Sequence, residues 1–173
     1  ADADTALKSI NLAADEAVTW SSVLGGDDAS AFSLSSGGVL SFNGQANFES
    51  KSSYSLSVSA TDTAGNSRTQ ALVITLLDVN EAPTAVGSIP DQSAASGSSA
   101  WSLNAALFFA DVDAGDTATY SLASGSLPAL LSLHTTTGLI SGTPSAASDS
   151  ASYTITRTDA AGLTASQAFN LQV

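Results

Sequence analysis

The chain contains no cysteine, one histidine and four basic residues among 173. Without cysteine there is no disulfide framework and no thiolate metal site. A single histidine leaves zinc, iron and copper almost without the nitrogen and sulfur ligands that they prefer. The formal net charge of −12 leaves no basic face for nucleic acid or an anionic membrane, so neither is expected as a partner, whereas divalent cations are favoured.

The sequence also lacks an apolar run long enough to span a bilayer, so no membrane insertion is expected. No signal peptide is visible, and we expect the segment to be a piece of a longer protein. The apolar fraction of 43% is enough for folded cores, which excludes a disordered acidic tail. Charged residues make up only 12%, and a surface rich in serine, threonine and alanine suits an extracellular or cell-surface location of a secreted protein.

Short motifs recur along the chain in the same order. Thr19-Trp20-Ser21 returns as Thr119-Tyr120-Ser121, Gly38–Ser41 as Gly138–Ser141, and Thr61–Gly65 as Thr158–Gly162. Such ordered repetition predicts two copies of one domain. The acidic stretch Asp78–Pro83 separates them, so we expect one domain over residues 1–80 and a second over residues 81–173.

Each copy has the pattern of short β-strands. Tyr54, Leu56 and Val58 alternate with serines, as in a strand with one buried face. We expect residues 72–76 and 169–173 to be the last strands of the two copies, and residues 104–109 to form one short turn of helix. With no long helical pattern, the predicted fold class is all-β: two tandem β-sandwiches of Greek-key type. Arg157, in an inward phase, is expected at a strand end, where it reaches solvent or a carboxylate.

Two resemblances to known families emerge from these motifs. Phe48-Glu49, residues 52–62 and Asp78–Pro83 together resemble a bacterial cadherin-like repeat. The second copy resembles the dystroglycan-type cadherin-like domain through Ile89–Gln92, Phe109–Asp113, Leu127-Pro128, Thr137-Gly138 and Ser141–Pro144. The resemblances imply a cadherin/immunoglobulin-like fold, with a cadherin-like domain at 1–80 and a dystroglycan-type cadherin-like domain at 81–173.

Cadherins place calcium at the junction of successive repeats, and the resemblance implies a ligand set here. The implied positions are Glu49 in copy one, Asp78, Val79, Asn80 and Glu81 in the linker, and Asp111, Asp113 and Asp159 in copy two. The linker is one residue shorter than the vertebrate pattern, and Asn47 replaces the usual aspartate, so one or two ions are expected rather than three. The competing interpretation of Asp78–Pro83 is a solvated linker.

Electrostatics favours Ca²⁺ for such a set. Like charges 4 Å apart repel by roughly 4 kcal/mol at an effective dielectric near 20. Four basic residues are too few to neutralise the carboxylates internally, and calcium takes six to eight hard oxygen ligands in flexible geometry. An EF-hand loop beginning at Asp111 fails, because Leu122 stands where the bidentate glutamate is required. A second site formed by Asp15, Glu16 and Asp62 with a preceding repeat stays open.

These observations predict a non-enzymatic, calcium-binding tandem module of a large extracellular bacterial adhesin or surface protein, in which calcium stiffens the junction. Its partners would be neighbouring repeats of the same chain. The alternative is a calcium-dependent carbohydrate-binding module of a secreted polysaccharide-active protein, with a polysaccharide or cell-surface glycan as partner. Trp20, Trp101 and Tyr120 are either core residues or sugar-stacking platforms. His134 has no nucleophile or metalloprotease motif around it, so no enzyme is expected.

Overall fold

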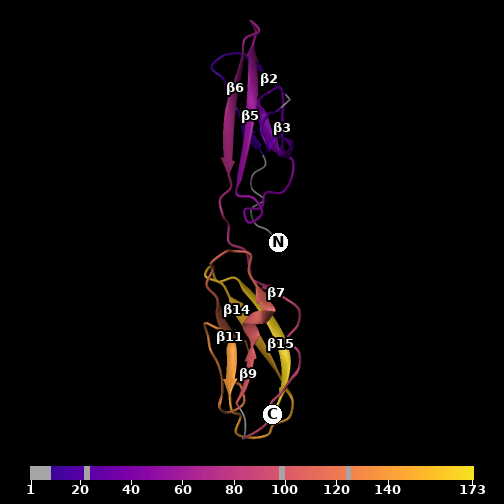
Figure 1. Ribbon diagram of the computed structural model, residues 1–173, viewed down its shortest axis with the longest axis vertical. Coiled ribbons are helices and arrows are strands. Elements are labelled where there is room, and N and C mark those ends of the chain that lie inside the picture. Colours follow the sequence, from indigo (N-terminus) through magenta and orange to yellow (C-terminus); the bar gives the residue numbers. More distant parts are fainter. Residues whose placement is uncertain (1–8, 22–23, 98–99, 124–125) are drawn as a thin grey trace. The chain divides into compact units, whose positions relative to one another are not determined.

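The computed structural model describes residues 9–21, 24–97, 100–123 and 126–173 of the chain. It contains two compact units, unit 1 (Ala1–Val79) and unit 2 (Asn80–Val173), which are described separately (Figure 1). In the described residues the helices are two short 3₁₀ turns, η1 (Ala29–Ala31) and η2 (Ala105–Phe108). Neither is long enough to cross a membrane. The predicted all-β class is therefore confirmed, and η2 lies where one helical turn is predicted.

Unit 1 is built from two antiparallel sheets. The first has the order β1 (Ser9–Asn11), β4 (Val39–Phe42), β3 (Phe32–Leu34), and the second β2 (Val18–Trp20), β5 (Ser53–Asp62), β6 (Ser67–Thr75). The alternation predicted for β5 is present, because Tyr54, Leu56 and Val58 are buried and the serines before each of them face outward or are half-buried. They meet Phe32 and Leu40 from the other sheet, so the core lies between the two sheets.

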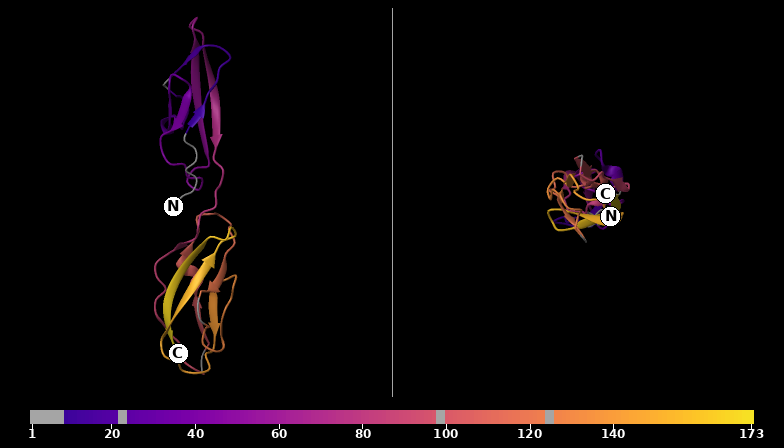
Figure 2. Two further views of the ribbon diagram at one scale, coloured as in Figure 1. Left: turned by 180° about the vertical axis from the view of Figure 1, so that it is seen from behind. Right: turned by 90° about the horizontal axis from the view of Figure 1, so that it is seen from below.

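Unit 2 has the same plan with more strands. One sheet has the order β11 (Thr119–Leu122), β14 (Ala151–Thr158), β15 (Thr164–Gln172), β8 (Gln92–Ser93), and another β12 (Leu131–Leu133), β13 (Leu139–Gly142), β9 (Trp101–Asn104). A third pairs β10 (Phe109–Ala110) with β7 (Thr84–Ala85). The chain crosses between these two sheets from β8 to β9, from β11 to β12 and from β13 to β14, as in a Greek key. Figure 2 shows β14 and β15 side by side, and Ile140, Ile155 and Leu171 are fully buried between the layers.

Strand pairing defines which residues of the two units correspond. Thr19 pairs with Thr61 on β5, and Thr119 pairs with Thr158 on β14. The next pairs are Trp20 with Ala60 and Tyr120 with Arg157. The repeats seen in the sequence therefore occupy equivalent places in the two sandwiches.

The final strands begin earlier than predicted. β6 starts at Ser67 and β15 at Thr164, rather than at residues 72 and 169. Each starts directly after a tight turn, so its polar residues are hydrogen-bonded to the preceding strand from the outset. The apolar residues that signal these strands in the sequence lie only in their second halves.

Candidate metal site

Three carboxylates gather at one end of unit 2. Asp111, Asp116 and Asp159 each offer an oxygen, and these oxygens lie within 4.8 Å of one another. Asp111 directly follows β10, Asp116 lies in the loop before β11, and Asp159 directly follows β14. Together with Asp113, these residues are called the acidic end of unit 2. Ligand sets of this kind, made of hard oxygens, suit Ca²⁺ rather than softer metals.

Asp159 is 5% exposed and is held on both sides. Its Oδ1 accepts a hydrogen bond from the backbone N–H of Leu163 at 2.7 Å, and its Oδ2 accepts one from Asn80 Nδ2 at 2.9 Å. Burial acts to raise the pKa of Asp159, but the hydrogen bonds from Asn80 and the turn outweigh it and hold the pKa below its usual value. Asp159 is therefore kept ionised, as a metal ligand must be.

The first residues of unit 2 are fastened to its acidic end. The backbone N–H of Glu81 donates to Asp113 Oδ2 at 2.9 Å, and Asn80 Nδ2 also donates to the carbonyl of Glu81 at 2.9 Å. Glu81 is 7% exposed, which is unusual for a carboxylate that serves only as a solvated linker residue. The structure thus brings together Asn80, Glu81, Asp111, Asp113 and Asp159, five of the predicted positions.

Asp116 is a neighbour that the sequence analysis does not assign as a ligand. Its two carboxylate oxygens accept from the backbone N–H of Ala160 at 3.3 and 3.4 Å, which ties the loop to the turn after β14. The spacing from Asp111 through Asp113 to Asp116 is the signal that could have found it. As an EF-hand loop the same spacing is incomplete, because Leu122 stands at the position of the bidentate glutamate.

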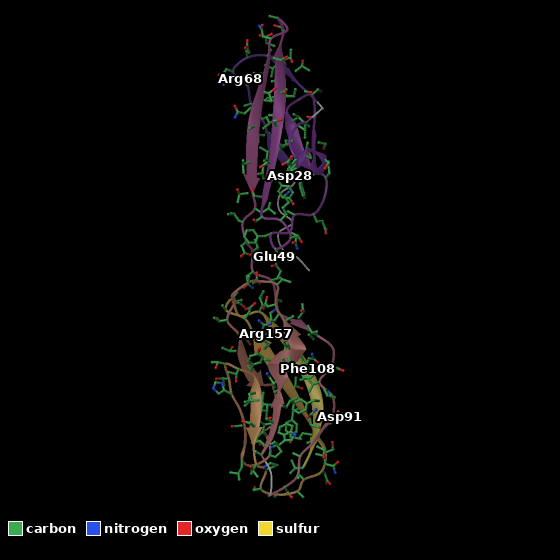
Figure 3. The ribbon with its side chains drawn as sticks, in the orientation of Figure 1. Asp28, Glu49, Arg68, Asp91, Phe108 and Arg157 are labelled. Carbon is green, nitrogen blue, oxygen red and sulfur yellow. The ribbon has the colours of Figure 1, made fainter. Side chains whose placement is uncertain are left out.

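Arg157 reaches a carboxylate, one of the two alternatives predicted for it. Its Nη2 lies 3.2 Å from Asp111 Oδ2, and both side chains are nearly inaccessible, at 9% and 5% exposed (Figure 3). The expectation that no basic residue neutralises this group of carboxylates is therefore wrong at Asp111. Burial, with the nearby charges of Asp113 and Asp116, nevertheless leaves the pKa of Asp111 raised. A bound cation would share Asp111 with Arg157.

The remaining predicted ligands belong to unit 1. Glu49 is exposed. Two residues before it, the Oδ1 of Asn47 accepts a hydrogen bond from the backbone N–H of Ser50 at 2.5 Å. Glu49 lies at one end of unit 1 and Arg68 toward the other (Figure 3). Asp78 and Val79 are exposed at the end of this unit. Their assignment as ligands stays a prediction.

The end of unit 1 opposite Glu49 differs from the acidic end of unit 2. Asp15 and Glu16 are exposed, and Asp62 is engaged by its own turn through Asn66. Among the described residues of unit 1, no three carboxylates lie as close together as those of unit 2. Asp15, Glu16 and Asp62 therefore form no close group of three carboxylates by themselves, and a second site that they would complete with a preceding repeat stays a prediction.

The aromatic residues separate into core and surface. Tyr120 is 7% exposed and packs edge-on against Phe109, with ring centroids 6.2 Å apart. Trp101 is partly buried against the core of unit 2. Trp20 is partly buried and lines a surface groove of unit 1. Tyr120 is therefore a core residue rather than a sugar platform.

The fold resembles solved cadherin ectodomains. The crystal structure of mouse cadherin-23 EC22-24 matches with a TM-score of 0.65 at 24% identity, over 90% of this chain and 52% of that chain. The human desmocollin-1 ectodomain gives a TM-score of 0.58 at 17% identity, over 96% and 36%. Protocadherin gamma B2 extracellular cadherin domains 3-6 give 0.60 at 20%, over 90% and 42%. The chain spans about half of these structures or less, and the likeness shows the fold.

Sequence comparisons give a family for the second unit. No curated protein matches the chain. The family model described as "Putative Ig domain" (He_PIG) matches residues 82–173, which include Asp111, Asp116 and Asp159. The predicted cadherin/immunoglobulin-like fold is confirmed. Because the match covers more than half of the sequence, the chain belongs to this Ig-domain family.

Proposed function

We propose that this chain is a non-enzymatic, calcium-binding tandem module of an extracellular adhesin or surface protein of the bacterial cadherin-like type. The observation that carries the proposal is the acidic end of unit 2, where oxygens of Asp111, Asp116 and Asp159 lie within 4.8 Å of one another. The likeness to cadherin ectodomains and to extracellular cadherin domains supports the adhesive, extracellular setting. The dystroglycan-type assignment of residues 81–173 is part of the same proposal.

The charge at this end favours a divalent cation. Carboxylates at such separations repel one another, and at an effective dielectric near 20 each like pair costs about 3 to 4 kcal/mol. Arg157 offsets one negative charge, at Asp111, and within the described residues no second cation lies within ion-pair distance of Asp113, Asp116 or Asp159. A calcium ion would relieve the remaining repulsion while accepting the irregular geometry of loop carboxylates.

Calcium would also act on the linker. Asn80 and Glu81 are hydrogen-bonded to Asp159 and Asp113, so an ion at the acidic end would hold the start of unit 2 in place. We propose that Glu49, Asp78 and Val79 of the preceding repeat complete the coordination. In that arrangement calcium stiffens the connection between neighbouring repeats, and without it the linker behaves as an ordinary hinge.

Isothermal titration calorimetry with Ca²⁺ and Mg²⁺ tests the proposal. Asp116→Asn keeps the side-chain shape and removes one charge, and is expected to weaken calcium binding about tenfold or more. Asp149→Asn is the matched control, because Asp149 is an exposed acid of the same unit remote from the cluster, and it should leave binding unchanged. Magnesium should compete poorly, since it demands tighter octahedral geometry. Equal effects of the two substitutions would refute the site.

A second measurement addresses the linker. Glu49→Gln should weaken calcium binding without lowering the stability of unit 1, because Glu49 is exposed. Chelation should broaden the distribution of particle lengths in small-angle scattering. A different outcome is that the acidic end binds calcium while Glu49→Gln leaves the calcium affinity unchanged and chelation leaves the scattering profile unchanged. In that case the ion is confined to unit 2 and the stiffening role fails.

A further inference from the structure

Arg157 is the only lysine or arginine in the sequence of unit 2, which also contains seven aspartate and glutamate residues. The fold places this one cation at the acidic end, because Arg157 lies two residues before Asp159 and its Nη2 lies 3.2 Å from Asp111 Oδ2. Its side chain is 9% exposed. The charge is therefore kept out of solvent beside the carboxylates, whereas arginines are mostly exposed in folded proteins.

The register of β14 directs this arginine inward. Tyr153 and Ile155 lie on the same face of the strand and are buried in the core of unit 2. Arg157 continues that face by one step, paired with Tyr120 on β11 and with Ala165 on β15. Because side chains alternate along a strand, the guanidinium is on the inner face. An apolar residue would occupy this place without the desolvation cost of a buried charge.

The ion pair satisfies Arg157 only in part. Among the described residues, its buried Nε has no hydrogen-bond partner, and the contact of Nη2 with Asp111 Oδ2 lacks hydrogen-bond geometry. The other oxygen of Asp111, Oδ1, accepts from the backbone N–H of Asp113 at 3.3 Å. Replacing both members of such a pair by apolar residues is often neutral, although removing one member alone is costly. Stability therefore does not explain why an arginine stands here.

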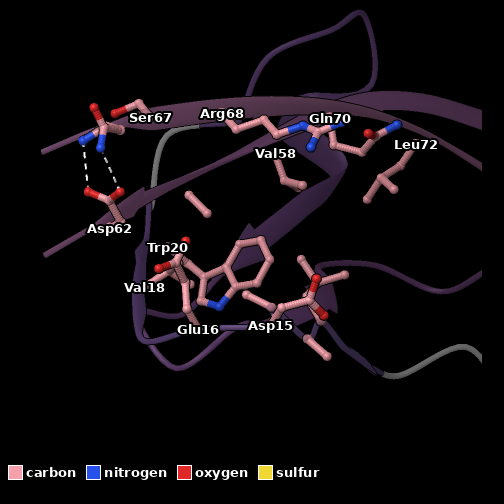
Figure 4. Close-up of a pocket in the computed structure, with 15 residues that line it drawn as sticks. Asp15, Glu16, Val18, Trp20, Val58, Asp62, Ser67, Arg68, Gln70 and Leu72 are labelled. Carbon is pink, nitrogen blue, oxygen red and sulfur yellow. Dashed lines mark hydrogen bonds between the residues drawn. The ribbon is translucent and has the colours of Figure 1, made fainter. Parts of the chain in front are cut away.

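Unit 1 shows that the sandwich does not require this arrangement. Ala60 has the register position of Arg157, and Arg68, the arginine of unit 1, lies opposite Ala60 on β6. Figure 4 shows Arg68 extending along β6 away from Asp62, whose carboxylate is held by hydrogen bonds within its own turn. Within the described part of unit 1, Arg68 forms no ion pair. The buried pair is thus found beside the carboxylate cluster of unit 2.

A cation at the acidic end would share one carboxylate with Arg157. Asp116 and Asp159 are held by N–H donors without formal charge, and among the described residues only Asp111 of this cluster has a charged partner. Arg157 lowers the formal charge of the acidic end from −4 to −3. The calcium affinity of an oxygen site depends on the charge of its ligands and on its rigidity. Because like charges repel, the guanidinium stabilises the calcium-free end and opposes the ion.

We propose that Arg157 sets the calcium affinity of the acidic end as an internal competitor of the ion. This inference rests on the calcium-binding function proposed above. Without calcium, the guanidinium neutralises Asp111 and stabilises unit 2. With calcium, the two cations compete for that carboxylate. Arg157 thereby keeps the dissociation constant in the range of about 10⁻⁴ to 10⁻³ M that is typical of extracellular calcium modules.

Isothermal titration calorimetry of the full chain with CaCl₂ tests this role. Arg157→Gln keeps a polar side chain and removes the charge, so calcium should bind about tenfold more tightly. Arg157→Lys keeps the charge, and its calcium affinity should stay within about threefold of that of the unmodified chain. Arg68→Gln is the matched control, because it removes the same charge from unit 1 and should leave calcium binding unchanged.

Urea unfolding separates competition from a purely structural role. Without calcium, Arg157→Gln should lower the midpoint of unit 2, because a buried carboxylate loses its partner. Binding and stability are linked, so saturating calcium should stabilise the variant more than the unmodified chain, and the two midpoints should approach one another. A purely structural role of Arg157 would leave the gap between the midpoints unchanged.

A third measurement uses the unmodified chain. The ¹⁵Nε–¹Hε NMR signal of Arg157 should shift during a calcium titration with the midpoint that calorimetry gives, whereas the signal of Arg68 should stay in place. This signal decides the question even if Arg157→Gln does not fold.

The outcomes distinguish the role of Arg157 from the proposed function. Calcium binding that Arg157→Gln leaves unchanged or weakens, or an Arg157 signal that bound calcium does not shift, would overturn the role of Arg157 and leave the proposed function standing. Absence of calcium binding in both the unmodified chain and Arg157→Gln would refute the proposed function, and the role of Arg157 with it.

Discussion

The two Thr-Asp turns, at Asp62 in unit 1 and Asp159 in unit 2, have nearly the same backbone and different partners. Gly65 and Gly162 adopt φ of 89° and 90°, and each donates to the carbonyl of its aspartate at 3.2 and 3.3 Å. Asp62 is satisfied within its own turn, since Asn66 Nδ2 donates to its Oδ2 at 2.8 Å. At Asp159 that position is leucine, and Asn80, far away in sequence, supplies the donor instead.

The difference shows how one motif can serve two purposes. In unit 1 the turn is complete by itself, and the short connection from Asn11 to Thr19 brings no aspartate cluster to it. In unit 2 the longer connection brings Asp111 and Asp116 to the turn. The local sequence therefore makes a turn in both units, and the neighbouring loop decides whether its carboxylate can join a metal site.

The largest effect is expected from Arg157, which has no charged counterpart in unit 1. Arg157→Ala copies the residue at position 60 and leaves Asp111 buried without its partner, so unit 2 should lose about 3 to 5 kcal/mol in urea unfolding. Adding Asp111→Asn should restore a large part of the lost free energy of unfolding, because the unpaired charge is removed. If Arg157→Ala costs no more than an exposed substitution, the ion pair contributes nothing to the fold.

Core truncations compare the two sandwiches directly. Leu40 and Ile140 are 1% and 0% exposed and occupy equivalent strands, so each change to alanine should cost about 2 to 4 kcal/mol. Because each core is separate, we expect each substitution to shift only the unfolding transition of its own unit, as followed by residue-resolved hydrogen exchange. Loss of protection in both units from either substitution would contradict two independent domains at residues 1–80 and 81–173.

A smaller effect is expected from exchanging the turn residues. Asn66→Leu removes the hydrogen bond that lowers the pKa of Asp62 most, so that pKa should rise toward its usual value in a ¹³C carboxyl NMR titration. Leu163→Asn should give Asp159 a donor within its own turn. Asn80→Ala should then raise the pKa of Asp159 less than it does in the unmodified chain. An unchanged effect of Asn80→Ala would mean that the local donor does not substitute.

The smallest effect concerns pH. The pKa of Asp62 is lowered by its hydrogen bonds, first that of Asn66, so its contribution to stability is present above the unfolded value of about 3.9 and is lost as pH falls through its folded pKa. The pKa of Asp111 is raised by burial, so its contribution is present below the unfolded value and is lost as pH rises through its folded pKa. Urea midpoints between pH 2 and 7 should therefore change in opposite directions for Asp62→Asn and Asp111→Asn. If the two variants change the urea midpoint in the same direction, the opposite pKa shifts of Asp62 and Asp111 are contradicted.

Several features follow from local sequence. The alternation at Tyr54, Leu56 and Val58 predicts β5, because a period of two places one face of a strand in the core. The repeated motifs predict equivalent pairing in two domains, and Thr61 and Thr158 do occupy matching registers. Oxygen-bearing side chains clustered near a proline-containing linker predict the ligand chemistry of a hard cation.

Other features depend on contacts between distant residues, which local patterns do not specify. The sequence does not decide between solvent and a carboxylate as the partner of Arg157, and the loop after β10 brings Asp111 to it. Asn80 reaches Asp159 across 79 positions of the chain. Asp116 joins the cluster because its loop folds back onto Ala160. The sequence by itself determined the fold class, the repeat and the kind of ligand atom; tertiary packing decided where the final strands begin, which carboxylates meet and which one is paired with arginine.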